Sequence, residues 1–388
     1  MMKPDDPFTA NLSVASLGDA FASGGAASHA RTALYFVAFL SCLFGALARY
    51  PWSTLWRQRP LLVIAAPTYS LVALLLTWRL ILKFFVAFTR FYISHPDPPN
   101  LFVDAYALVC DSLAGWWWSS LLLCWVTVAC PVAHAEASRR GLAVGSALAY
   151  VTVAFLGAVS LAFPLFLSHL LVLPRLPPPR ATRAAAAASG APRHAWLWPA
   201  CTLAALLSIV ALPLSVHNAR PVFIAALACL HVVLAVPFAA QSAAATGRQP
   251  VAALSPTQLR ILAMGTTLLY WGASMGALRE LTTSAGLNER PVGPRLVGIA
   301  SALAAAAARN VCQASIALDA ALSSLAGLIF MGASAQPGER SLAAMACLAS
   351  PLIGPAASLG LFCARREEDA RGGALGGAAR SRKRRSVD

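Results

Sequence analysis

Three polar residues stand in or beside one long apolar run in the second half of the chain. Asp319 lies near the middle of this run, and Asn310 and Gln313 lie at its start. A carboxylate at the centre of a bilayer costs at least about 2.5 kcal/mol, so such a residue faces protein or water and often marks a pathway. The alternative is a structural role, in which Asp319 is protonated or paired inside a helix contact, for example with Arg295 or Arg309. In both cases we expect the side chain to face the bundle rather than lipid.

The motifs of common enzymes are absent from the sequence. It contains no paired carboxylates, no HExxH motif, no GxSxG motif with partners and no glycine-rich phosphate loop. The nine cysteines show neither a CxxC motif nor the Cys/His spacing of a metal site. His134 and Glu136 are expected in a solvated loop. We therefore predict that the protein is not an enzyme and holds no metal or cofactor.

Composition predicts that the polar residues are carried by membrane helices. The chain has 388 residues, of which 58% are hydrophobic and 12% are charged, whereas a soluble domain carries roughly 25% charge. The formal net charge is +15, but the basic residues lie between apolar runs and in the tail, as loop charges do in membrane proteins. We predict an all-α, polytopic transmembrane helical bundle whose partner is the lipid bilayer, with no binding of nucleic acid.

A segment rich in proline and arginine divides the chain into two apolar halves. It reads PRLPPPRATRAAAAASGAPRH. Three consecutive prolines prevent a regular helix, and such a backbone cannot lie in hydrocarbon. Its arginines place it on the cytoplasmic side. The predicted organisation is a polar N-terminal segment (1–31), a first transmembrane half (32–173), a cytoplasmic linker (174–194), a second transmembrane half (195–363) and a basic disordered tail (364–388).

The predicted number of spans is about eleven, within a range of about ten to twelve. Five lie before the linker and six after it, which puts the N-terminus outside and the linker and tail inside. The long run 141–172 is interpreted as two short spans that meet near 157–160. Residues 296–308 are counted as a weak, buried span and 342–362 as the last one. No sustained internal repeat is visible in the sequence.

The basic, aromatic segment 79–93 and a tryptophan triplet are the other membrane features. Residues 79–93 could extend the second helix, lie flat at the interface or cross the membrane. We favour the flat arrangement, because Lys83 would otherwise lie in the membrane interior; crossing would raise the count to twelve. Residues 116–118 are three tryptophans, which we expect in the interfacial belt.

Modification and tethering sites are predicted near the two termini. Asn11 begins the N-glycosylation sequon Asn-Leu-Ser. Cys363, at the cytoplasmic end of the last span, is a candidate for palmitoylation. Five basic residues at the end of the tail are predicted to hold it against the anionic cytoplasmic leaflet; they are Arg380, Arg382, Lys383, Arg384 and Arg385.

The layout as a whole resembles the multi-spanning envelope protein family of alphaherpesviruses encoded by gene forty-three of the unique-long region. The matching features are the length, the two apolar halves around a Pro/Arg-rich loop, the Ala/Arg-heavy composition and the short basic tail, with GALAR (45–49) and NVCQA (310–314) as local pieces. The resemblance implies a protein of the virion envelope and host membranes that tempers membrane fusion driven by viral envelope glycoproteins. It implies no catalytic residues.

A more remote likeness is to equilibrative nucleoside transporters. Those proteins divide six spans from five around a cytoplasmic loop, whereas the charge pattern here gives five and six. The likeness implies a small-molecule, nucleoside-like transporter or a degenerate transporter. An enclosed polar cavity lined by Asp319 would favour transport, and a tightly packed interior would favour the non-transporting envelope protein. No oligomeric state is predicted.

Overall fold

All regular structure in the part of the chain that the computed structural model describes is helical. The described residues are 26–92, 101–174, 196–216, 219–244, 253–284 and 291–369. The predicted all-α bundle is therefore confirmed. The helices are α2 (Ala26–Ala48), α3 (Trp52–Gln58), α4 (Pro60–Tyr92), α5 (Leu101–Cys110), α6 (Leu113–Arg139), α7 (Val144–Leu156), α8 (Val159–Val172), α10 (Leu197–Ser215), α11 (Arg220–Ala244), α12 (Pro256–Ser284), α13 (Val292–Ala307), α14 (Val311–Ser334), the short η2 (Pro337–Glu339) and α15 (Arg340–Ile353), followed by a helix over 355–369.

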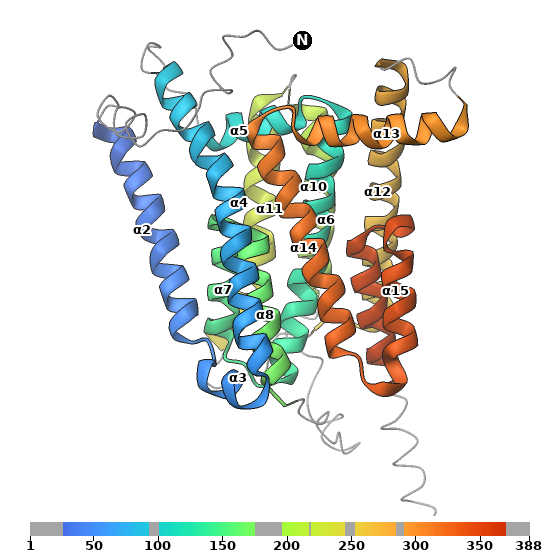
Figure 1. Cartoon of the computed structure of the whole chain (residues 1–388). Helices are drawn as coiled ribbons and strands as arrows, with labels where there is room; N and C mark the ends of the chain where they lie inside the picture. The colour runs from blue at the N-terminus through green and yellow to red at the C-terminus, as the bar shows by residue number, and fades with distance from the viewer. Residues whose placement is uncertain are drawn as a thin grey trace, which may run out of the picture.

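The long helices run between two ends of the bundle, which we call the upper and the lower end as they stand in Figure 1. Helices α2, α6, α11 and α14 descend, and α4, α10 and α12 ascend. Helix α3 lies at the lower end, whereas α5 and α13 lie at the upper end (Figure 1). The chain therefore passes through the bundle several times, as a multi-pass membrane protein does.

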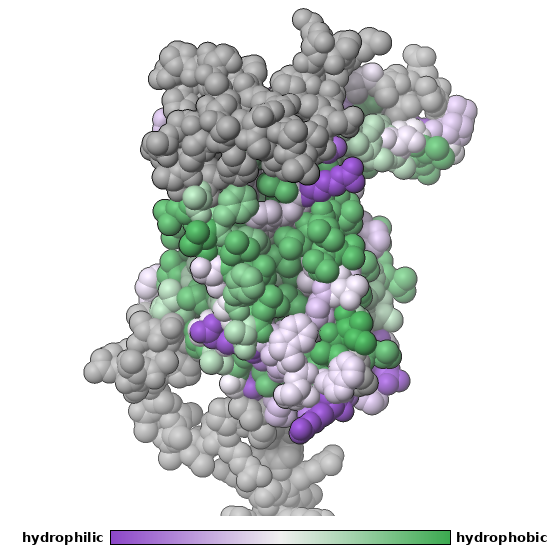
Figure 2. Space-filling view, turned by 60° about the vertical axis from the view of Figure 1, so that its left-hand side comes forward, coloured by the Kyte–Doolittle hydropathy of each residue, from purple (hydrophilic) through white to green (hydrophobic). Residues whose placement is uncertain are grey.

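Six helices in the described residues are long and apolar enough to cross a membrane, or seven if the bent pair Ala33–Ala48 and Trp52–Gln58 forms one span. Figure 2 shows a broad apolar band on one face of the molecule, with hydrophilic residues above and below it. Apolar helices and an apolar band are the marks of an integral membrane protein. The six are Leu61–Val86, Leu113–Arg139, Leu197–Ser215, Arg220–Ala240, Pro256–Ser284 and Val311–Ser334.

Helix α4 extends further than the sequence interpretation allowed. It is one helix of 33 residues, Pro60–Tyr92, so a separate flat helix over 79–93 is wrong and the alternative of an extended second helix holds. At 1.5 Å per residue α4 is about 50 Å long, while a hydrocarbon core is about 30 Å thick. The candidate span Leu61–Val86 nevertheless includes Arg79 and Lys83, so only Arg90 among the basic residues in the upper part of α4 lies beyond it.

Two of the predicted spans before the linker form a hairpin that enters and leaves at the lower end. We call residues 144–172 hairpin 1. Its arms, α7 and α8, have 13 and 14 residues and pack against each other. The predicted break is confirmed, because α7 ends at Leu156 and α8 begins at Val159. Arg140 donates to the carbonyls of Leu170 and Leu173 (2.9 Å for Leu173), so both feet of the hairpin lie together.

The last predicted span is also a hairpin, and one predicted span does not cross. Residues 340–369, here called hairpin 2, break at Gly354, and Arg366 Nε lies 3.5 Å from Glu339 Oε2 at its two feet. Helix α13 lies across the upper end instead of running along the bundle (Figure 1). The count of about eleven crossing helices is therefore not reproduced, because the apolar helices Val144–Leu156, Val159–Val172 and Val292–Ala307 are too short to count as spans.

The arrangement repeats within the chain although the sequence shows no repeat. An ascending helix, a short helix at the upper end, a descending helix and a hairpin from the lower end follow one another twice: α4, α5, α6 and hairpin 1, then α12, α13, α14 and hairpin 2 (Figure 1). The two descending helices pack against each other. They meet at matching positions, since Gln313 Nε2 donates to the Gly115 carbonyl (3.1 Å), 198 residues earlier, and Arg309 lies 3.6 Å from Asp111.

Candidate functional site

Asp319 caps the broken helix at the tip of hairpin 1. Its carboxylate accepts hydrogen bonds from the backbone N–H groups of Val159 (3.1 Å) and Ser160 (2.7 Å), and Ser323 Oγ lies 3.4 Å away on the same helix as Asp319. The first turn of a helix has N–H groups without intrahelical partners and carries partial positive charge. Inside a bilayer no water satisfies them. Asp319, 8% exposed, supplies the acceptor, so it faces the bundle and does not pair with Arg295 or Arg309 in the described contacts.

The other side of the same turn receives donors. Helix α7 ends with carbonyls that lack intrahelical partners. The Tyr35 hydroxyl on α2 donates to the Leu156 carbonyl, and the Trp78 indole N–H on α4 donates to the Gly157 carbonyl (3.3 Å). Side chains from α2, α4 and α14 therefore satisfy the exposed backbone on both sides of the tip of hairpin 1.

Among the described residues, the side-chain hydrogen bonds to the tip of hairpin 2 come from α12. Three consecutive carbonyls at the end of α15 accept side-chain hydrogen bonds: Pro351 from the Tyr270 hydroxyl (2.8 Å), Leu352 from the Trp271 indole (2.7 Å) and Ile353 from the Thr267 hydroxyl (3.2 Å). Gly354 follows with φ of +88°, a conformation that L side chains rarely adopt. The descending arm then starts at Pro355, which has no N–H to satisfy.

The two tips are equivalent in the repeat but differ in chemistry. Trp78 on α4 and Trp271 on α12 donate to the two breaks, within the short matching pieces LLTW and LLYW. The position equivalent to Asp319, 198 residues earlier as in the Gln313–Gly115 contact, is Leu121, which lines a small pocket beside Gly354 and Pro355. Only hairpin 1 is thus given a carboxylate cap at its tip among the described contacts.

The tip of hairpin 1 also depends on a glycine. A Cβ atom on Gly157 would lie 2.3 Å from Cε2 of Phe39, a buried ring stacked on Trp78. Gly157→Ala is therefore expected to destabilise the protein by about 1–3 kcal/mol, the usual effect of overpacking, measured as a lower midpoint of thermal unfolding in detergent. Gly145→Ala is the matched control, because nothing lies within 4 Å of its Cβ position. Equal midpoints for the two variants would contradict this account.

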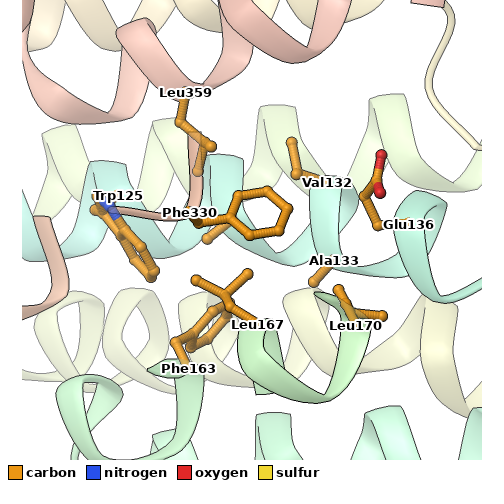
Figure 3. A pocket seen from close by; sticks show the side chains of 10 residues that line it. Trp125, Val132, Ala133, Glu136, Phe163, Leu167, Leu170, Phe330 and Leu359 are labelled. Carbon is orange, nitrogen blue, oxygen red and sulfur yellow. The ribbon is translucent and has the colours of Figure 1, made fainter. Parts of the chain in front are cut away.

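The interior between the hairpins is closely packed. The best-defined space there, lined by α6, α8, α14 and the helix over 355–369, has a volume of about 10 Å³, about the room that one water molecule requires. Figure 3 shows Trp125, Phe163, Phe330 and Leu359 around this space, with Glu136 at one edge. Asp319 lines neither of the two best-defined pockets.

Glu136 is the centre of a buried ion-pair cluster at the lower end. The prediction that His134 and Glu136 lie in a solvated loop is wrong, because α6 continues to Arg139 and both side chains are buried. Glu136 lies 3.1 Å from Arg140 Nε, 3.3 Å from Arg139 Nη1 and 3.9 Å from Arg366 Nη1. These contacts join α6 to the feet of both hairpins.

Two further ion pairs enlarge this cluster across the two halves of the chain. Arg139 pairs with Glu367, and Arg366 pairs with Glu339 and donates to Ser334 Oγ (3.2 Å). The Arg366 guanidinium also lies 5.1 Å from the centre of the Phe362 ring. Residues from the ends of α6, α8 and α14, from η2 and from the second arm of hairpin 2 therefore close the bundle where the linker leaves it.

The other predicted site residues do not join Asp319. Asn310 caps α14 by accepting the Gln313 N–H (2.8 Å), and the Gln313 side chain binds α6 as described above. Asn310 lies nine residues before Asp319, or about 13 Å along the helix. Cys363 is 7% exposed in the core, which argues against acylation of its thiol in the folded protein. Asn11 and the basic tail residues Arg380, Arg382, Lys383, Arg384 and Arg385 lie outside the described residues.

The fold and the site define a class: an integral membrane protein with an all-helical bundle, two hairpins broken inside the bundle and an ion-pair closure at one end. Within the residues that the structure describes, no group of three or more His, Cys, Asp or Glu side chains is placed to hold a metal ion. Comparison with protein-family models, curated proteins and solved structures finds no match to this chain.

Proposed function

We propose that the chain is a non-enzymatic, multi-pass protein of viral envelopes and host membranes that modulates glycoprotein-mediated membrane fusion or envelope trafficking. The observation that carries the proposal is the packed interior between the hairpins, with about 10 Å³ of space. Because the hairpins enclose so little space in the described residues, we expect the protein to act through its surface. Several large apolar side chains of α12 and α15, such as Met264 and Leu348, point outward, where membrane-anchored partners such as viral fusion glycoproteins have access to them.

The proposal includes an orientation in the membrane. The linker and the tail are cytoplasmic and the N-terminus is outside, with eleven intramembrane segments: seven crossing helices and the four arms of the two hairpins. Support comes from the basic residues on and beside α3 and at the end of α6, which all belong to the lower end, because cytoplasmic loops carry the excess of arginine. Glycosidase-sensitive modification that disappears in Asn11→Gln would support this orientation, and a glycosylated site engineered into the linker would overturn it.

Cell–cell fusion tests the proposed function. Cells that express viral fusion glycoproteins together with this chain are expected to fuse several-fold less than cells that express the glycoproteins with an unrelated multi-pass protein. Surface levels of the glycoproteins are measured in both populations, because reduced trafficking also lowers fusion. Unchanged fusion together with unchanged glycoprotein levels would contradict both parts of the proposal.

A transporter is the second candidate, and the broken helices favour it. Secondary transporters place substrate and ion sites where half-helix ends meet near the midplane, often between structural repeats. Both hairpins end inside this bundle, and the tip of hairpin 1 is capped by the acidic residue Asp319 of α14. Saturable uptake of a labelled nucleoside into proteoliposomes, reduced in Asp319→Asn, would establish transport. Uptake no greater than in protein-free liposomes would reject it for that substrate.

A further inference from the structure

Helix α13 connects α12 to α14 along the upper end, and only its inner half docks on the bundle. Ala302, Leu303 and Ala306 pack against a small cluster that includes Ala114 and Leu281. The Leu303 carbonyl also accepts a hydrogen bond from the Trp118 indole (3.3 Å). No residue of α13 is classed as buried. The outer half of the helix extends away from these contacts (Figure 1).

One apolar stripe runs along the whole length of α13. Its members, Val292, Leu296, Ile299 and Leu303, are spaced four, three and four residues apart, which places them on one face of a helix. Leu303 packs on the bundle, whereas Leu296 is 62% and Val292 is 74% exposed. The same face is therefore covered by protein at one end of the helix and uncovered at the other.

The depth of α13 follows from the tryptophans it touches. Trp117 lies in the docking cluster of α13, and Trp118 donates to its backbone. Tryptophan is enriched at membrane–water interfaces, and both residues lie in the first turns of α6, next to the upper end. A helix that is held at this level and lies across the upper end of the bundle (Figure 1) lies in the interfacial region.

We propose that the outer half of α13, residues 292–299, lies in the headgroup–acyl boundary of the leaflet at the upper end, with phospholipid covering Val292, Leu296 and Ile299. A helix with an apolar stripe along one side binds in this way. Outside the stripe, this half of α13 carries glycine, proline and Arg295, together with Val297, which is 68% exposed. Because Ala308–Asn310 lead directly into α14, this contact ties the leaflet surface to the helix that carries Asp319.

Site-specific quenching in nanodiscs tests the contact. An environment-sensitive fluorophore is introduced by amber suppression at position 296, on the stripe, and at position 301 as the matched control, since Ser301 is exposed and lies on the opposite face. Phospholipid with a nitroxide near the headgroup is expected to quench the label at 296 at least threefold more than the label at 301. Iodide in the buffer should show the reverse order.

Photolabelling of the unmodified protein by lipid tests the same contact without any labelled variant. A phospholipid with a photoreactive group near its glycerol backbone is expected to form adducts on peptides that contain residues 292–299 in nanodiscs. Equal iodide quenching at 296 and 301 would overturn the proposal. Protein–protein crosslinks through residues 292–299 in place of lipid adducts would also overturn it, because a second chain would then cover the stripe.

Discussion

Replacement of Asp319 by leucine is expected to lower the free energy of unfolding by about 2–6 kcal/mol, because two buried N–H groups would lose their acceptor and each costs about 1–3 kcal/mol. The groups are those of Val159 and Ser160 at the tip of hairpin 1. Leucine has a similar size but no acceptor. In hydrocarbon the loss cannot be repaired by water, so the first turn of α8 is expected to unwind or the hairpin to withdraw from α14.

Two further variants separate the cap from a general packing effect. Asp319→Asn retains one acceptor oxygen and is expected to lose less stability than Asp319→Leu. Ser324→Ala serves as the control on the same helix, since the Ser324 hydroxyl bonds only the Ala320 carbonyl in the described contacts (2.7 Å), and it should change the free energy of unfolding by no more than about 0.5 kcal/mol.

The measurement is thermal unfolding in detergent followed by size-exclusion chromatography, with the membrane-inserted fraction determined in parallel. Insertion should be unchanged in all three variants, because the apolar runs that direct it are intact. If Asp319→Leu unfolds at the same temperature as the parent protein, the carboxylate does not cap the hairpin.

The sequence predicted the helical class well because apolar run length reports directly on helices in membranes. It also located the break in hairpin 1, since Gly157 interrupts a run too long for one span. It did not predict that α13 lies flat or that the last span breaks at Gly354. Hydropathy measures whether a segment prefers lipid, and it does not distinguish a crossing helix from an interfacial one or from half of a hairpin. Alanine, which dominates the second half of α13, has little preference for either lipid or water.

The partner of Asp319 could not be predicted for a different reason. A charged partner, Arg295 or Arg309, was predicted for Asp319. The partners are instead backbone N–H groups of α8. Every residue except proline carries such a group, so no residue type in the sequence identifies the partner. Only the fold, which ends a helix beside α14, creates the need for an acceptor there.

The spacing of the charged residues around Glu136 could have predicted that the helix continues through it. Arg139 lies three residues and Arg140 four residues after Glu136. These are the spacings at which opposite charges meet on one helix. Glu136 was predicted to lie in a solvated loop instead. Extension of the helix by two turns buries Glu136 and Arg140 and leaves Arg139 half-buried. Glu136 then meets Arg366 from the other half of the chain.

The repeat explains why the two hairpins need different caps. Both ascending arms end in carbonyls that receive an indole N–H, from Trp78 or Trp271. The descending arm of hairpin 1 begins with two N–H groups that require an acceptor, and Asp319 provides it. The descending arm of hairpin 2 begins with Pro355, which removes one of these donors, and Leu121 stands at the equivalent position of α6. Leucine is tolerated there because the demand for an acceptor is smaller.

Glu136→Ala is expected to have an effect as large as the loss of Asp319, about 3–5 kcal/mol, because it would remove the one carboxylate that contacts both Arg140 and Arg366. Arg140 and Arg366 are both nearly inaccessible, and each contacts Glu136. Glu339 still lies 3.5 Å from Arg366, but the loss of negative charge beside two buried guanidinium groups is not compensated by water. The feet of both hairpins would then separate, since Arg140 also holds the end of α8 and Arg366 the junction of α14 and α15.

Glu368→Ala is the matched control, because Glu368 pairs with Arg260 and Arg365 at the exposed rim of the same end. Exposed pairs contribute no more than about 1 kcal/mol, so this variant should unfold within a few degrees of the parent protein. The lower end should also open in Glu136→Ala, seen as faster hydrogen exchange in residues 134–140 and 360–369 but not at the tips of the hairpins. If Glu136→Ala and Glu368→Ala unfold alike and exchange alike, the buried cluster does not hold the two halves together.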